Sequence, residues 1–179
     1  DFDAAAATKL IEAFVDDLSN WYVRRSRRRF WKSESDSDKL AAYASLYECL
    51  VTLAKLMAPF TPFLAEEMYG NLVVSFAPPL HVVERGLGGE VPESVHLTDW
   101  PVSDASRIDR TLSDETRLVM RIASLGRAAR AKAQLKVRQP VAELFVKLPT
   151  QLEEHALERL APQLLEELHV KALRIVRDE

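Results

Sequence analysis

The sequence predicts a mainly α-helical fold, a helical bundle followed by a small C-terminal α+β appendage, and three observations support this prediction. Apolar residues recur at three- and four-residue intervals along several long stretches, which is the spacing of amphipathic helices. Proline and glycine are scarce and concentrated between Pro59 and Pro101, so few breaks interrupt the other stretches. Beyond residue 140 the period changes, and residues 143–148 and 172–176 favour strands.

Four long helices are predicted before the strands, and their apolar stripes in series are typical of an α-bundle. Their ranges are 3–29, 39–57, 62–74 and 106–133. Thr61 and Pro62 fit an N-cap followed by a proline in the first helical turn. Gly126 lies on the apolar stripe of the fourth helix, where glycine costs about 1 kcal/mol relative to alanine. The close approach of a neighbouring backbone would compensate for that cost.

The connections and the C-terminal part complete the predicted organisation. Residues 75–101 predict a loop-rich connection, with an extended piece at 94–98. A helix over 152–169 separates the two predicted strands, which would be parallel if they pair. Because two strands alone make a poor sheet, we expect further chain to complete it. The predicted domains are a helical domain over 1–140 and a β-α-β junction element over 141–179.

The composition bounds the class of protein. The 179 residues carry a net charge of −3 and the pI is about 5.9, so any nucleic-acid site must be a local basic surface. The single cysteine, Cys49, excludes an internal disulfide and suits a reducing cytoplasm. We expect no membrane association, because we see no apolar run long enough to span a bilayer and no signal peptide. The sequence starts at Asp1 inside a helical pattern, so we expect a fragment of a larger protein.

Two basic blocks stand out. Residues 18–31, LSNWYVRRSRRRFW, hold five arginines and four aromatic residues without an acid, and residues 117–138 hold seven basic residues without an acid. Guanidinium groups bind phosphates through a planar fork of donors, and aromatic rings stack on unpaired bases, so this combination favours RNA binding. Solvated basic helix faces remain the alternative for both blocks.

The first block continues the apolar stripe of the first helix. That stripe comprises Ala7, Leu10, Ile11, Phe14, Val15, Leu18, Trp21 and Tyr22. Continued at 100° per residue, it meets Arg25, Arg28, Arg29 and Lys32. Either the helix extends beyond the bundle there, or Arg25 is buried against a carboxylate. Arg24 and Arg27 would point outward in both cases, and Trp21 and Tyr22 belong to the core.

Residue types suited to catalysis or metal binding are not grouped in the sequence. His81 and His96 lie outside any metal-ligand spacing with Cys or Asp, and Cys49 has no evident base partner. A Gly-rich phosphate loop is also absent from the sequence. The sequence therefore predicts no catalytic site, metal site or cofactor in this chain.

Four motifs carry a resemblance to a known family. SNWYVRRSRRRFW, LAPFTPFLAEEMYGNL, SVHLTDWP and SLGRAARAKAQLKVRQP together cover most of the chain up to about Pro140. They are similar to the anticodon-binding domain of class I aminoacyl-tRNA synthetases, and the RRSRRRFW and KVRQP forms resemble the isoleucyl branch best. The resemblance implies a helical bundle that recognises the anticodon stem and loop of isoleucine tRNA, with a small junction domain behind it.

The resemblance also implies what the parent protein does. It would be an ATP-dependent isoleucine–tRNA ligase that uses ATP and Mg, and a zinc site in the parent stays open. The HIGH and KMSKS signatures of the family's catalytic domain are absent here. The fragment would therefore bind tRNA without charging it, and its partners would be isoleucine tRNA and the catalytic and editing domains of the parent chain.

Within this reading, the two basic blocks would contact phosphates of the anticodon stem, while rings near Trp31 stack on loop bases. The candidate RNA-binding residues are Arg24, Arg27, Arg28, Arg29, Trp31, Lys32, Arg127, Arg130, Lys132, Lys136 and Arg138. Two alternatives stay open. The domain could come from a valyl-, leucyl- or methionyl-tRNA synthetase, or the chain could be a helical protein-interaction module that binds an acidic partner.

Overall fold

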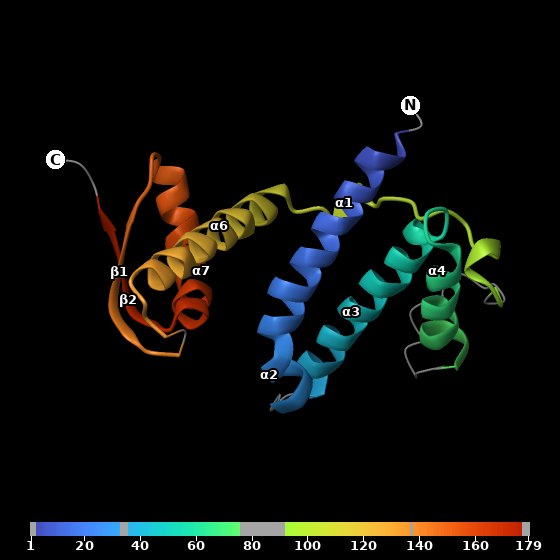
Figure 1. The fold of residues 1–179 in the computed structure, drawn as a ribbon, viewed down its shortest axis with the longest axis horizontal. Helices are drawn as coiled ribbons and strands as arrows, with labels where there is room; N and C mark the ends of the chain where they lie inside the picture. Colours follow the sequence, from blue (N-terminus) through green and yellow to red (C-terminus); the bar gives the residue numbers. More distant parts are fainter. Residues whose placement is uncertain (1–2, 33–35, 76–91, 137, 177–179) are drawn as a thin grey trace. The chain divides into compact units, whose positions relative to one another are not determined.

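A computed structural model describes residues 3–32, 36–75, 92–136 and 138–176 of the chain (Figure 1). The chain divides into two compact units, Asp1–Ser103 and Asp104–Glu179, and each is described by itself. The prediction of a mainly helical fold with a small C-terminal α+β element is confirmed. These units meet at residue 104, and the domain boundary that the sequence suggests near residue 140 stays a prediction.

The first unit consists of helices. Its elements are α1 (Ala4–Asp17), the π-helical turn η1 (Leu18–Val23), α2 (Arg24–Lys32), α3 (Asp36–Met57), α4 (Pro62–Tyr69), a second π-helical turn η2 (Gly70–Ser75) and the short 3₁₀ turn η4 (Val95–Leu97). Two acids, Asp36 and Asp38, lie in the first turn of α3, where their negative charges interact favourably with the positive end of the helix dipole. Thr61 is the N-cap of α4 and Pro62 follows in its first turn, as predicted, although the Thr61 hydroxyl donates to the Met57 carbonyl instead of capping α4.

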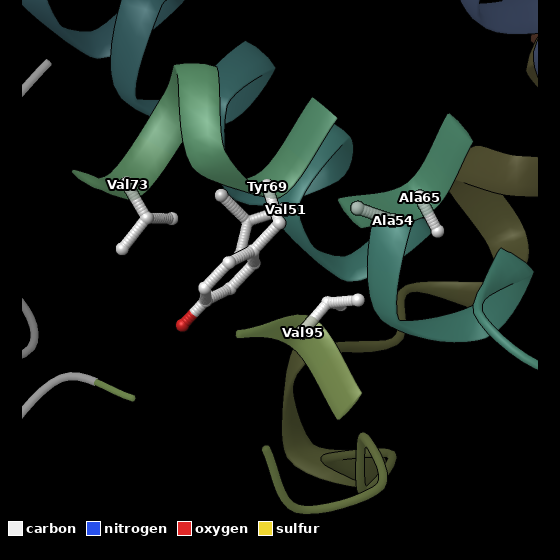
Figure 2. Close-up of a cluster of buried hydrophobic side chains, with 6 residues drawn as sticks. All are labelled: Val51, Ala54, Ala65, Tyr69, Val73 and Val95. Atoms are coloured by element: carbon white, nitrogen blue, oxygen red, sulfur yellow. The ribbon is translucent and has the colours of Figure 1, made fainter. Parts of the chain in front are cut away.

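The core of this unit lies between α3, α4 and η4. Figure 2 shows side chains from four elements pointing toward one another, with Tyr69 as the largest of them. The buried cluster comprises Val51, Ala54, Ala65, Tyr69, Val73 and Val95. Because Val95 reaches this core from a segment far along the chain, it ties residues 94–98 to the helices.

The expected extended piece at 94–98 is instead the 3₁₀ turn η4, and local hydrogen bonds explain the difference. The Glu66 carboxylate accepts hydrogen bonds from the Ser94 hydroxyl at 2.9 Å and from the Val95 N–H at 3.0 Å. The Ser94 hydroxyl oxygen in turn accepts from the His96 N–H. A turn satisfies these donors at once, so the short apolar alternation of this segment did not produce a strand. The rest of the predicted connection, residues 76–91, lies outside the described residues.

The apolar stripe predicted for the first helix does not face a core in α1. None of the residues of α1 is buried, and Leu10, Phe14 and Val15 are exposed. Buried positions begin at Leu18 and continue with Ser26 and Phe30. The π-helical turn η1 adds a residue to one turn, so the stripe shifts by one position and Arg25 and Arg29 leave the core line. This is why a stripe extrapolated at 100° per residue predicted the wrong core residues in α2.

The apolar character of α3 also corrects an expectation from the sequence. By length and composition its 22 residues could cross a membrane, although no such run was expected. Helices of a protein core pass the same test, although only 22% of the apolar stretch of α3 is buried. Here α3 packs against both α2 and α4 and supplies Val51 and Ala54 to the core of Figure 2.

The second unit is a helix pair with a small parallel sheet (Figure 1). Its elements are the 3₁₀ turn η5 (Ala105–Arg107), α6 (Arg110–Lys132), β1 (Val141–Lys147), α7 (Gln151–Leu168) and β2 (Val170–Val176). The two strands pair in parallel, as expected, with Val141 opposite Val170. Asp109 caps α6 and Thr150 caps α7, each accepting a backbone N–H bond of the first turn.

Packing explains why α6 belongs with the sheet unit. α6 contributes Leu118, Val119, Ile122 and Ala123 to a core whose other wall is α7, from Ala156 to Leu168. Gly126 allows this approach, because a Cβ there would lie 2.5 Å from Cδ1 of Leu168. The sequence attributed Gly126 to a neighbouring backbone, whereas the close neighbour is the buried Leu168 side chain.

Candidate RNA interface

The first basic block lies on α2, whose nine residues include five arginines. Arg24, Arg27 and Arg28 are exposed, and the Trp31 side chain is 82% exposed. Arg27 and Arg28 precede Trp31 by four and three residues, so these side chains share one face of the helix. This face presents an uncovered indole ring beside guanidinium groups, which is a combination suited to bases and phosphates. The Lys32 side chain lies outside the described part of the chain.

Another face of α2 is fixed to α3. Phe30 is buried, and its ring centroid lies 5.0 Å from that of Tyr43. Just before α2, the Tyr22 hydroxyl donates a hydrogen bond to the Ala42 carbonyl at 3.1 Å. These contacts hold the basic face outward, and they require no participation by Arg27, Arg28 or Trp31.

Arg29 has an intramolecular partner. Its Nε lies 3.0 Å from both carboxylate oxygens of Asp38, and its Nη2 lies 2.7 Å from Oδ1. The hydrogen bonds to the Asp38 carboxylate raise the pKa of Arg29, and burial opposes this rise. With Arg29 39% exposed and Asp38 46% exposed, this fork-on-carboxylate pair joins α2 to the start of α3.

Arg25 and its neighbours complete the base of the block. Trp21, Tyr22 and Arg25 are half-buried, where the sequence placed the two aromatic residues in the core. The Arg25 guanidinium carbon lies 5.0 Å from the centroid of the Trp21 ring, a cation–π contact. Arg25 therefore covers Trp21 and leaves Trp31 as the uncovered indole of this block.

The second basic block begins along α6, and acids from outside the block meet its arginines. Arg121 lies 3.6 Å from Glu153 and Arg127 lies 2.7 Å from Glu167, both on α7, while Arg117 pairs with Asp114 at 3.0 Å. The sequence suggested an unmixed basic face because no acid occurs between residues 117 and 138. The acids come from α7 and from the preceding turn of α6, so the middle of the block is locally neutralised.

The cations at the end of the second block have a different environment. Lys132, Lys136 and Arg138 are exposed, and none of them forms an ion pair with another residue in the described ranges. They follow one another through the turn that leads from α6 to β1. We call these three residues the terminal cluster.

Arg130 lies beneath the terminal cluster and has backbone partners. It is 9% exposed, and its Nη1 donates to the Leu168 carbonyl at 3.2 Å. Its Nη2 donates to the Lys136 carbonyl at 2.6 Å and also to the Gln139 carbonyl. The guanidinium thus bonds the end of α7 and two points of the α6–β1 turn, which is a structural position rather than an exposed one.

The sequence analysis did not single out two exposed residues near this end of the sheet, His169 and Lys171. The Val141 N–H donates to the His169 carbonyl at 3.0 Å, so the starts of β1 and β2 are adjacent. His169 and Lys171 are exposed at the start of β2. The predicted parallel β-α-β arrangement carried the signal that could have found them, because it places the beginnings of both strands at one edge.

Metal-ligating groups are not gathered in the described ranges, where no cluster of three or more His, Cys, Asp or Glu side chains occurs. His96 Nε2 lies 3.9 Å from Glu66 Oε2, close to the turn that the same carboxylate holds. His81 lies outside the described residues.

Comparison with known sequences identifies the class of protein. The family described as the anticodon-binding domain of tRNA ligase matches residues 2–146, so α1 through most of β1 falls within it. The chain belongs to this family of anticodon-binding domains. The match includes α2 and the terminal cluster, which are the two exposed basic surfaces described above.

Relatives of this chain are isoleucine–tRNA ligases. It is 58% identical over 174 residues to the isoleucine–tRNA ligase of Dehalococcoides mccartyi strain 195, covering 97% of this chain and 16% of that protein. It is 47% identical to the ligase of Thermus thermophilus, over 98% of this chain and 16% of that protein. The ligase of Streptomyces coelicolor is 43% identical over 96% of this chain and 15% of its own length. The chain thus spans about a sixth of the length of these relatives.

Proposed function

We propose that this chain recognises the anticodon stem and loop of isoleucine tRNA as part of an isoleucine–tRNA ligase. In this proposal the parent protein is an ATP-dependent, cytoplasmic ligase, and ATP and Mg act in its catalytic domain. This chain contributes binding and positioning of the tRNA. Its partners are the isoleucine isoacceptor and the remaining domains of the parent chain.

The observation that carries the proposal is family membership over residues 2–146, because this stretch contains both exposed basic surfaces. On α2, Arg27 and Arg28 would bind phosphates and so orient the RNA, since phosphate contacts position a nucleic acid without reading its sequence. Trp31 would stack on a base of the anticodon loop, because single-stranded loops expose unstacked bases to aromatic side chains.

The proposed roles of the sequence candidates differ with their surroundings. Arg24, Arg27, Arg28, Trp31, Lys132, Lys136 and Arg138 are proposed as direct contacts. Arg29 and Arg127 are proposed to contribute mainly through their pairs with Asp38 and Glu167, since a carboxylate bound to a guanidinium opposes phosphate binding. Lys32 remains a candidate on its sequence position alone.

Filter binding of purified tRNA species tests the proposal. We expect the chain to bind isoleucine tRNA more tightly than valine, leucine or methionine tRNA, and to retain it against heparin at equal charge. Equal binding of all four tRNAs would argue against the isoleucine assignment. Full displacement by heparin would instead indicate a module that binds acidic partners without selecting RNA.

A matched pair of tryptophan variants tests the proposed stacking. Stacking of one base on an aromatic side chain contributes about 1–3 kcal/mol. Trp31→Ala should therefore weaken tRNA binding by at least about fivefold. Trp100→Ala is the control, because Trp100 is also exposed in the same unit, at 58%, but lies outside the basic block. Equal effects of the two substitutions would remove Trp31 from the interface.

A further inference from the structure

Arg130 is buried, whereas the other basic residues of the second block are exposed. Its side chain leaves α6 at the last full turn and points beneath the α6–β1 turn, where it donates to the carbonyls of Leu168, Lys136 and Gln139. These carbonyls come from the end of α7 and from two points of the turn. One guanidinium on α6 therefore fixes two segments that lie far apart in the sequence, the end of α7 and the α6–β1 turn.

Backbone hydrogen bonds and the Arg130 side chain together hold the α6–β1 turn. Two residues beyond the end of α6, Gln134 has a left-handed φ of 56°, and the Leu135 N–H donates back to the Arg130 carbonyl at 3.0 Å. Beyond this cap, the Gln139 N–H donates to the Lys136 carbonyl, and that same carbonyl accepts from the Arg130 guanidinium. Arg130 thus holds the backbone at residues 136 and 139, on both sides of Arg138.

From this geometry, and resting on the proposed function, we propose that Arg130 is the positioning residue of the terminal cluster and does not itself bind RNA. Its guanidinium fixes the backbone from which Lys136 and Arg138 project, so these two cations with Lys132 meet RNA phosphates in a prearranged geometry. Ordering flexible side chains on binding costs free energy, and this loss is smaller where the turn is already ordered before the RNA binds. Arginine suits this role because its planar fork bonds several carbonyls at once, which the single ammonium of lysine cannot reproduce.

The test compares Arg130→Lys with Arg117→Lys in binding to isoleucine tRNA. Both substitutions keep the positive charge and both sites lie on α6, but Arg117 pairs with Asp114 at the exposed surface of that helix. We expect Arg130→Lys to weaken binding about tenfold, the scale of releasing two long side chains from a fixed backbone. Arg117→Lys should change binding little. The Gln139 amide should also exchange with solvent faster in Arg130→Lys.

A double-mutant cycle separates positioning from a merely structural role. In a Lys136→Ala/Arg138→Ala background, Arg130→Lys should cause no further loss of affinity, because the side chains that it positions are gone. A loss of melting temperature in both backgrounds with unchanged tRNA affinity would make Arg130 purely structural and overturn the proposal. If Arg130→Lys lowers the tRNA affinity equally in the Lys136→Ala/Arg138→Ala background, then Arg130 contacts RNA directly. That outcome would also overturn the proposal.

A measurement on the unsubstituted chain keeps the proposal testable even if Arg130→Lys fails to fold. In guanidinium NMR spectra, tRNA should shift the Arg138 signal and leave the Arg130 signal in place. A shift at Arg130 equal to that at Arg138 would contradict the assignment. Failure of the unsubstituted chain to bind any tRNA would instead reject the proposed function, and the positioning role with it.

Discussion

Arg27 and Arg29 lie two residues apart on α2, and their surroundings differ. Arg27 is exposed on the face that carries Trp31, whereas Arg29 is bonded to both oxygens of Asp38. The sequence placed Arg27 outward and Arg29 on the continued apolar stripe, yet it proposed both as RNA contacts. The partner that distinguishes them lies across a turn, on α3, so spacing along α2 could not identify it.

Separate substitution of the two arginines by glutamine tests this difference. Arg27→Gln should lower tRNA affinity and flatten the dependence of log affinity on log salt by about 0.7–0.9, the contribution of one phosphate contact. Arg29→Gln should instead lower the free energy of unfolding by about 0.5–1 kcal/mol, the range for a well-aligned but partly exposed pair. Thermal melts and salt-dependent filter binding of both variants provide the comparison. A flattened salt slope in Arg29→Gln alone would reverse these assignments.

Cys49 gives a prediction about pH. Burial, and secondarily the charge of Glu48, raises the pKa of its thiol. Because the folded pKa lies above the unfolded value, this group favours folding below the unfolded pKa, and its contribution is lost as pH rises through the folded pKa. Iodoacetamide should therefore alkylate the folded chain more slowly at pH 8 than the chain in denaturant, since the thiolate is the nucleophile. Equal rates would contradict the assigned environment, and Cys49→Ser supplies the unlabelled control.

At the scale of elements, helices and strands were predictable because their periodicity is a local property. The sequence placed α3, α4, α6, α7 and both strands within a few residues of their positions. It misplaced the core residues of α2, because the π-helical turn η1 changes the register without a sequence signal that we can identify. It also missed η4, where Glu66 of a distant helix provides the deciding hydrogen bonds.

The contact between α6 and α7 gives a prediction at this scale. Gly126→Ala would gain up to about 1 kcal/mol of helix propensity, but its Cβ would lie 2.5 Å from Cδ1 of buried Leu168. Overpacking in a core typically costs about 1–3 kcal/mol, so we expect a net loss of stability of about 1 kcal/mol. Ser124→Ala is the control, because Ser124 is exposed on the same helix and its substitution gains propensity without a clash. If denaturant unfolding shows that both substitutions stabilise the chain, then α7 shifts to accommodate the added methyl group. That result would contradict the predicted net loss of stability.

At the scale of the whole molecule, the net charge of −3 coexists with exposed basic surfaces in each of two compact units. The sequence located both surfaces because runs of basic residues are visible without a structure. It could not tell exposed cations from neutralised ones, since Glu153 and Glu167 reach the second block from α7. The candidate residues that remain as proposed direct contacts share one property, which is that their side chains are exposed.

In the proposed function, this chain recognises the bases of an anticodon loop and does not merely bind negative charge. The most direct measurement is its affinity for the anticodon stem–loop of isoleucine tRNA against the same stem with a scrambled loop, at one fixed salt concentration. The two RNAs carry equal phosphate charge, so the electrostatic contribution cancels. We predict at least about tenfold tighter binding of the isoleucine loop, or ~1.4 kcal/mol, comparable with the stacking of one base. Equal affinity for both RNAs would contradict the account.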